Sequence, residues 1–112
     1  ALFAVSWELG AITAGASLDK RNSLIQFGKH LGLAFQIVDD LLDLRSSTEK
    51  LGKKAGKDAE AGKQTYPSVI GEQASEDRAE EKIKTAVDAL KIFGESAKPL
   101  EFIANFVVSR KL

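Results

Sequence analysis

The stretch SLIQFGKHLGLAFQIVDDLLDL, residues 23–44, decides the fold, because its apolar side chains recur at the spacing of one helical face. The pattern extends back to Asp19, a predicted N-cap, and forward to about Arg45. The resulting helix of about 25 residues is long for a globular protein and points to a large helical bundle. Its predicted inward face consists of Leu24, Phe27, Leu31, Ala34, Phe35, Val38, Leu41 and Leu42.

Two glycines interrupt this long helix. Gly28 and Gly32 lie four residues apart, and each costs up to roughly 1 kcal/mol relative to alanine inside a helix. We expect the close approach of another helix or of a ligand to compensate for this cost.

Further helical segments flank the long one. Residues 1–16 are small and apolar on nearly every side, which predicts a helix buried among others, with Trp7 in the core. Residues 46–67 lack sustained periodicity and are predicted to be mostly loop. Pro67 is expected to open a short helix through Ala74.

The C-terminal third continues the helical pattern. Ser75, followed by two acidic residues, is the predicted N-cap of a third major helix that ends near Gly94. Pro99 is expected to open the last helix. No strand pattern appears, so the predicted fold class is all-α. The inward residues are predicted to be Ala79, Ile83, Ala86, Val87, Leu90 and Phe93, and then Leu100, Ile103, Phe106 and Val107.

Composition bounds the function. The 112 residues suffice for one domain, and the net charge of zero gives no global attraction to nucleic acid or to an anionic membrane. The sequence contains no cysteine, which excludes disulfides, thiolate zinc sites and a cysteine nucleophile. Charged residues interrupt every long apolar segment, and no basic lead marks a signal peptide, so the expected compartment is the cytoplasm.

Two features of the sequence suggest that it is part of a longer protein. The sequence contains no methionine, and its first apolar pattern begins without a capping residue. We expect residues 1–112 to be the C-terminal fragment of a single, longer all-α domain.

An acidic stripe on the long helix is the candidate for chemistry. Residues three and four apart are neighbours on a helix, so Gln36, Asp39, Asp40 and Asp43 share one face. Asp39 and Asp43 form an unfavourable like-charge pair. The stripe is therefore either a solvated acidic face or a site that holds a cation.

The basic loop after the stripe favours the cation. Mg²⁺ typically takes one or two carboxylates, several waters and the phosphate oxygens of a substrate, while lysines neutralise the remaining phosphate charge. The residues alone therefore favour a diphosphate or polyphosphate ligand bridged by Mg²⁺. The loop lysines are Lys50, Lys53, Lys54, Lys57 and Lys63.

Other kinds of site have little support. His30 is the only histidine, which leaves little for a histidine metal site or a catalytic triad, and it is expected at the surface or between helices. The segment GKKAGK, residues 52–57, has three residues between its glycines, lacks Ser or Thr after its lysine and follows no strand. It therefore fails as a phosphate-binding loop.

The motif GLAFQIVDDLLDL and the following LGKKAGKDAEAGKQTYP resemble the second aspartate-rich region of the trans-isoprenyl diphosphate synthases. The similarity covers residues 32–67 and is closest in character to bacterial farnesyl or geranylgeranyl diphosphate synthases. It implies a prenyltransferase of isoprenoid biosynthesis that condenses an allylic diphosphate with isopentenyl diphosphate. It also implies a homodimer, Mg²⁺ as cofactor and the isoprenoid-synthase type of helical bundle.

The resemblance also implies roles for single residues. Asp39, Asp40 and Asp43 match the magnesium-binding aspartates, with Asp39 foremost. Gln36, Lys53 and Lys63 match residues that contact the allylic diphosphate. No acid or base residue is implied, because in this family the departing diphosphate accepts the proton. Weaker matches in the same loop are Lys54, Lys57 and Asp58.

This chain lacks the family's first aspartate-rich motif and its residues for isopentenyl diphosphate, so we expect it to be inactive alone. Two alternatives remain open: a non-catalytic partner subunit of a heteromeric prenyl synthase, and a helical module that only binds Mg²⁺ and polyphosphate. Product chain length does not follow from these residues, because the family sets it near the first motif.

Overall fold

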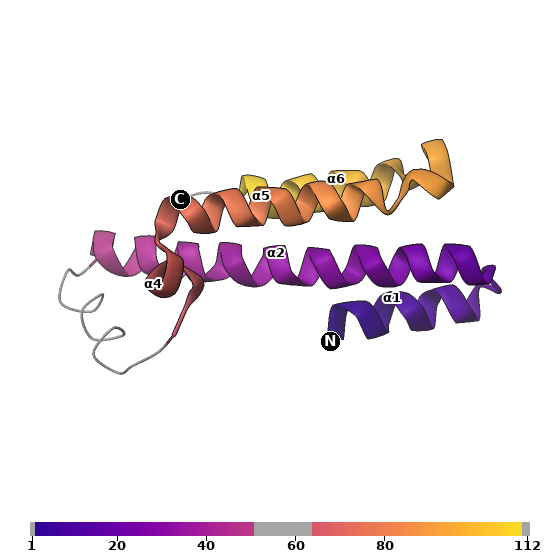
Figure 1. Cartoon of the computed structure of the whole chain (residues 1–112), viewed down its shortest axis with the longest axis horizontal. Helices are drawn as coiled ribbons and strands as arrows, with labels where there is room; N and C mark the ends of the chain where they lie inside the picture. The colour runs from indigo at the N-terminus through magenta and orange to yellow at the C-terminus, as the bar shows by residue number, and fades with distance from the viewer. Residues whose placement is uncertain (1, 51–63, 111–112) are drawn as a thin grey trace.

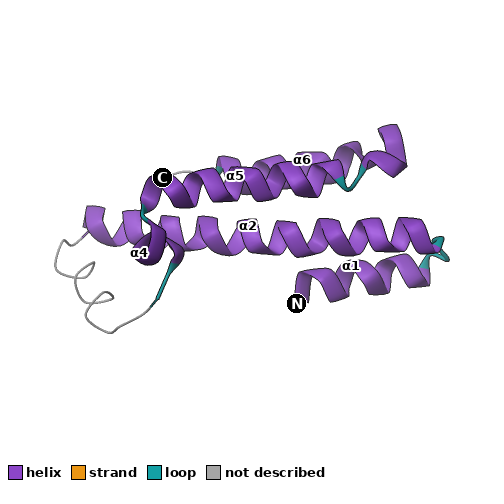
Figure 2. Ribbon diagram, in the orientation of Figure 1, coloured by secondary structure: helices purple, strands orange, loops and turns teal. Residues whose placement is uncertain are grey.

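The computed structural model describes residues 2–50 and 64–110. Within these residues every regular element is a helix and none is a strand, which confirms the all-α prediction (Figure 2). The elements are α1 (Leu2–Thr13), α2 (Leu18–Lys50), α4 (Tyr66–Ile70), α5 (Glu72–Asp88), the 3₁₀ segment η1 (Lys91–Ala97) and α6 (Lys98–Ser109).

The long helix α2 is the axis of the molecule, which measures 51 × 23 × 20 Å (Figure 1). Helix α1 runs back along the first half of α2, while α5 and α6 lie along its other side (Figure 1). The short helix α4 lies beside the second half of α2, where the acidic stripe is found. The stripe therefore lies where α2, α4 and the start of α5 meet.

The core follows the predicted faces of α2 and α5. The apolar residues named for α2 are all buried or packed against the core, and so are those named for the third major helix. The buried residues of the central cluster are Phe27, Leu31, Ala34, Ile37, Val38, Leu41, Ala79, Ile83, Ala86, Leu90, Ala97, Ala104 and Val107.

The two glycines of α2 mark the crossing with α1, as expected. A Cβ atom at Gly28 would lie 2.5 Å from Cδ1 of Trp7 and 2.9 Å from the carbonyl oxygen of Phe3. At Gly32 it would lie 3.2 Å from Cβ of Phe3. The half-buried Trp7 also meets the ring of Phe27 edge-on at 5.2 Å. Close helix packing is therefore what these glycines permit.

Several predicted helix ends are wrong. Ser17, not Asp19, caps α2, because the backbone N–H of Lys20 donates to its Oγ at 3.3 Å. The long helix continues to Lys50 rather than ending near Arg45. At its other end, Asp19 still lies in the first turn, where a negative charge complements the helix dipole.

Ser75 is not a helix cap either. It is fully buried inside α5, and its Oγ donates to the carbonyl oxygen of Gly71 at 2.7 Å. The helix starts one turn earlier at Glu72 and ends at Asp88, before η1, which is kinked at Gly94 with φ of 60°. Serine can satisfy its hydroxyl on a carbonyl four residues back, so its sequence signal does not separate a cap from an interior position.

The outer helices expose more apolar surface than predicted. On α1 the exposed side chains are Leu2, Val5, Leu9 and Ile12, although the helix was expected to be buried all round. On α6 Ile103 and Phe106 are exposed, while Ala104 and Val107 face the core. Among the described elements, helix α1 packs mainly on α2, and α6 packs on α5, α2 and η1, so each helix keeps one face exposed. None of the described helices has the length and hydropathy that crossing a bilayer requires.

Candidate functional site

The acidic stripe occupies the second half of α2. Asp39 and Asp40 are half-buried, whereas Gln36 and Asp43 are exposed. The structure places all four on neighbouring turns of one continuous helix, as the spacing predicts. Their side chains do not converge on one point, because Asp39 and Asp40 contact different neighbouring elements.

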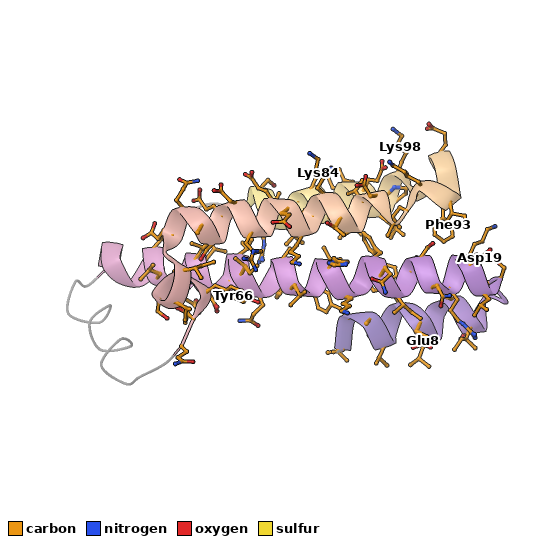
Figure 3. All side chains as sticks on the ribbon, viewed as in Figure 1. Glu8, Asp19, Tyr66, Lys84, Phe93 and Lys98 are labelled. Atoms are coloured by element: carbon orange, nitrogen blue, oxygen red, sulfur yellow. The ribbon has the colours of Figure 1, made fainter. Side chains whose placement is uncertain are left out.

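Asp40 joins α2 to α4. Its Oδ2 accepts a hydrogen bond from the backbone N–H of Tyr66 at 3.1 Å, and its Oδ1 accepts one from Nε2 of Gln36 at 2.9 Å. Tyr66 is the first residue of α4, and Figure 3 labels it where that helix lies beside α2. The sequence alone did not assign this role to Asp40, because the donor is a backbone group 26 positions away.

Asp39 pairs with Arg110 after the end of α6. Nη2 of Arg110 donates to Oδ1 of Asp39 at 3.1 Å, and the guanidinium lies 4.6 Å from the centre of the Phe35 ring. Nε of the same arginine donates to the carbonyl oxygen of Val107 at 3.4 Å. Arg110 is a charged residue at the site that sequence reasoning missed. Its only signal was a basic residue near the end of a helix.

The three aspartates do not form a multidentate metal cage. Among the described residues, no group of three or more acidic or histidine side chains could hold a metal ion. Mg²⁺ does not need such a group, since it binds through one or two carboxylates and completes its shell with water and phosphate. The exposed Asp43 and the surface-paired Asp39 fit that smaller requirement.

A groove of about 500 Å³ runs beside the stripe. Gln36 and Asp40 form one wall, the start of α4 with Tyr66 forms another, and Arg78 of α5 adds a positive charge. The other lining residues are Gln64, Thr65, Val69 and Ile70. The groove is thus bounded by polar groups of α2 and by the short helix that follows the basic loop.

A second charged contact fixes α5 against α2. Arg45 forms an ion pair with Glu76, and its Nε lies 3.6 Å from Oε2 of Glu72. The hydrogen bond to Glu76 is the main cause that raises the pKa of Arg45. The sequence did not predict this contact, because Arg45 was considered only as the end of the long helix.

His30 lies away from the stripe, on the first half of α2. It is half-buried, as the interhelical expectation allows, and its Nδ1 has no hydrogen-bond partner within the described part of the chain. Burial, and then the charges of Lys82 and Lys29, lower the pKa of His30. His30 is not among the described residues that line the groove.

The loop residues assigned to diphosphate binding, Lys53 and Lys63, lie outside the described residues. The same holds for Lys54, Lys57 and Asp58. Their roles stay predictions from the sequence.

The fold and site define an all-α protein whose longest helix carries an aspartate-rich stripe beside an open groove. Residues 1–98 match the model of a protein family described as polyprenyl synthetase. The chain belongs to this family, the group of trans-isoprenyl diphosphate synthases that the motif of α2 resembles.

Individual relatives agree with this membership. The chain is 44% identical over 101 residues to a geranylgeranyl diphosphate synthase of Cyanophora paradoxa, covering 90% of this chain and 34% of that protein. It is 43% identical to geranylgeranyl pyrophosphate synthase 7, chloroplastic, of Arabidopsis thaliana, covering 92% and 30%. The large subunit 1 of a heterodimeric geranylgeranyl pyrophosphate synthase, chloroplastic, of the same plant is 42% identical, covering 99% and 30%. The chain thus spans about a third of the length of these relatives.

Proposed function

We propose that this chain carries the second aspartate-rich half of the active site of a trans-prenyltransferase. The enzyme condenses an allylic diphosphate with isopentenyl diphosphate in isoprenoid biosynthesis. In the reaction the allylic carbon–oxygen bond breaks, the double bond of isopentenyl diphosphate attacks that carbon, and loss of a proton completes the product. The diphosphate leaves and serves as proton acceptor, which suits a site without a histidine base.

The observation that carries this proposal is the aspartate-rich stripe of α2 beside the groove, in a chain of the polyprenyl synthetase family. Gln36 lines the groove beside Asp40, and the second N–H of its amide, which does not donate to Asp40, can donate to an oxygen of the allylic diphosphate. Asp39 and Asp43 would hold Mg²⁺, which neutralises charge on the departing diphosphate. Lys53 and Lys63 are proposed to bind the same diphosphate from the loop.

A condensation assay tests the proposal. A synthase that contains this chain is incubated with an allylic diphosphate and labelled isopentenyl diphosphate, with and without Mg²⁺. We expect product only with Mg²⁺, and we expect Asp39→Ala to lower turnover about a hundredfold or more, because charge on the leaving group is no longer neutralised.

Asp77→Ala is the matched control. Asp77 is exposed on α5 and is not among the described residues that line the groove, and it accepts a hydrogen bond from the residue four positions earlier, as Asp40 does. This variant should keep its activity. Equal losses for Asp39→Ala and Asp77→Ala, or product without Mg²⁺, would contradict the proposed site.

The finer assignments belong to the same proposal. The names of the relatives support geranylgeranyl diphosphate as the product, which chromatography of the chain length tests. We also propose a homodimer, measured by light scattering, because α1 and α6 expose apolar stripes that an interface can cover. A cytoplasmic location remains part of the proposal, although two of the relatives are named as chloroplastic.

A second candidate is a subunit of a heteromeric prenyl synthase. One relative, 42% identical to this chain, is itself named as the large subunit of a heterodimeric enzyme, and this supports heteromeric assembly. The condensation assay separates the two candidates. Activity of the isolated protein favours the first, while activity only after a partner subunit is added favours the second.

A further inference from the structure

Asp40 differs from its two neighbours in how the fold uses it. Both of its carboxylate oxygens accept hydrogen bonds from the protein, from Tyr66 N–H at 3.1 Å and from Nε2 of Gln36 at 2.9 Å. Asp39 instead contacts the side chain of Arg110, and Asp43 is exposed. The fold therefore engages Asp40 with a backbone group of another helix.

Helix α4 requires an acceptor at this position. The first N–H groups of a helix have no partner within the helix. In α4 the second residue, Pro67, has no N–H, and the N–H of Ser68 donates to Oγ1 of the N-cap Thr65 at 3.3 Å. The N–H of Tyr66 is left, and Asp40 supplies its acceptor. Asp40 thus completes the cap of α4 from outside.

This cap determines where one wall of the groove stands. Helix α4 has five residues, too few to be stable by itself, so its position depends on contacts with its neighbours. Tyr66, labelled in Figure 3 at the start of α4 beside α2, lines the groove together with Val69 and Ile70. The bond from Asp40 fixes this wall relative to Gln36 on the opposite side.

The geometry of α2 also separates Asp40 from the other two carboxylates. One residue advances a helix by about 100°, so four residues bring a side chain back to within about 40°. Asp39 and Asp43 therefore lie nearly above each other, while Asp40 is rotated by about 100° from Asp39. That rotation directs Asp40 toward α4.

From these contacts we propose that Asp40 is a positioning residue, not a magnesium ligand. It holds the start of α4, and with it the wall of the groove, while Asp39 and Asp43 are left to bind the ion. This inference rests on the proposed function and refines the role that the family motif implies for the second aspartate.

The conservative substitution distinguishes the two roles. Asp40→Asn removes the charge that Mg²⁺ needs but keeps an oxygen for the N–H of Tyr66, and Gln36 can turn its amide to accept from the new side-chain nitrogen. Asp40→Ala removes both acceptors. We expect Asp40→Ala to weaken binding of an allylic diphosphate analogue about tenfold or more, and Asp40→Asn to recover most of this loss.

The Mg²⁺ concentration at half-maximal rate provides the kinetic comparison. We expect Asp39→Asn to raise it strongly and Asp40→Asn to leave it near that of the wild type. If Asp40→Asn raises it as much as Asp39→Asn does, Asp40 is a metal ligand and the inference is wrong.

Hydrogen exchange of the Tyr66 amide gives a readout that needs no activity. We expect this amide to be protected in the wild type and in Asp40→Asn, and to exchange about tenfold faster or more in Asp40→Ala. Asp77→Ala, which removes a similar hydrogen bond from Gln73 within α5, should leave it unchanged. If the Tyr66 amide exchanges at the same rate in the wild type and in Asp40→Ala, the proposed hydrogen bond between Asp40 and Tyr66 is wrong. Absence of Mg²⁺-dependent condensation in the wild type would refute the proposed function. Hydrogen exchange of the Tyr66 amide would still test the hydrogen bond to Asp40.

Discussion

Single residues of the site differ in how firmly the fold holds them. The Asp39–Arg110 pair leaves 40% and 26% of the two side chains exposed, and surface ion pairs of this kind are worth about 0.2–1 kcal/mol. Asp39 can therefore exchange Arg110 for a cation at small cost. The motif makes Asp39 a candidate magnesium ligand from the sequence alone. Its partner Arg110 lies 71 positions away, and no local pattern in the sequence connects the two residues.

His30 gives a prediction at the residue scale. Burial, then Lys82 and Lys29, lower its pKa below the ordinary value of 6.5, so the unfolded chain binds a proton more readily than the folded one. The stability contributed by neutral His30 is present above pH 6.5 and is lost as the pH falls through the lower folded pKa. Urea unfolding from pH 8 downward should show this loss in the wild type, and a weaker one in His30→Gln.

All other ionisable groups are the same in the two proteins, so the difference between the two curves is the quantity to compare. If the free energy of unfolding depends on pH in the same way in the wild type and in His30→Gln, the folded protein does not lower the pKa of His30.

At the scale of elements, the sequence predicted the central helices better than their ends. Hydrophobic periodicity specifies a face over many residues, which is why the inward residues of α2 and α5 were correct. A cap depends on one or two hydrogen bonds, and several nearby serines can provide them. Ser17 and Thr65 cap helices, whereas Ser75 lies within one.

The glycines of the α1–α2 pair provide a matched prediction. At Gly28 a Cβ atom would clash with Trp7 and with the backbone of Phe3, so Gly28→Ala should destabilise the protein by about 1–3 kcal/mol. Gly10 lies in α1 with nothing within 4 Å of its added Cβ, and Gly10→Ala should stabilise the protein by up to about 1 kcal/mol. Thermal unfolding measures both, and the same sign for the two variants would contradict the proposed packing.

At the scale of the whole molecule, the sequence failed for the outer helices, which have other helices on one face and leave the opposite face exposed. The apolar residues of α1 and α6 gave no sign of which side another helix would cover, so Leu9, Ile103 and Phe106 were wrongly expected inside. The acidic stripe was located correctly on the long helix, because its spacing depends on one helix alone. The contacts of Asp40 with Tyr66 of α4 and of Asp39 with Arg110 could not be predicted in this way, because each depends on how another part of the chain packs against α2.

The whole-molecule account also predicts different roles for the loop lysines. Lys53→Ala or Lys63→Ala should weaken binding of an allylic diphosphate roughly 10- to 150-fold and leave isopentenyl diphosphate binding nearly intact, because each removes one charge-assisted contact. Lys50→Ala should do much less, because the family motif assigns Lys50 no contact with the diphosphate, and salt screens a charge that is farther than about 8 Å from its ligand. Titration calorimetry of each variant with each ligand makes the comparison. Equal modest losses for all three lysines and both ligands would indicate only diffuse attraction.

The central claim is that Mg²⁺ links Asp39 and Asp43 of α2 to an allylic diphosphate. Its most direct test is calorimetric titration of the synthase with an unreactive allylic diphosphate analogue, with Mg²⁺ and with a chelator, in the wild type and in Asp39→Ala. We expect the wild type to bind tightly only with Mg²⁺, and Asp39→Ala to lose roughly 10- to 150-fold in affinity. Equal affinity of the wild type with Mg²⁺ and with the chelator, unchanged in Asp39→Ala, would contradict the claim.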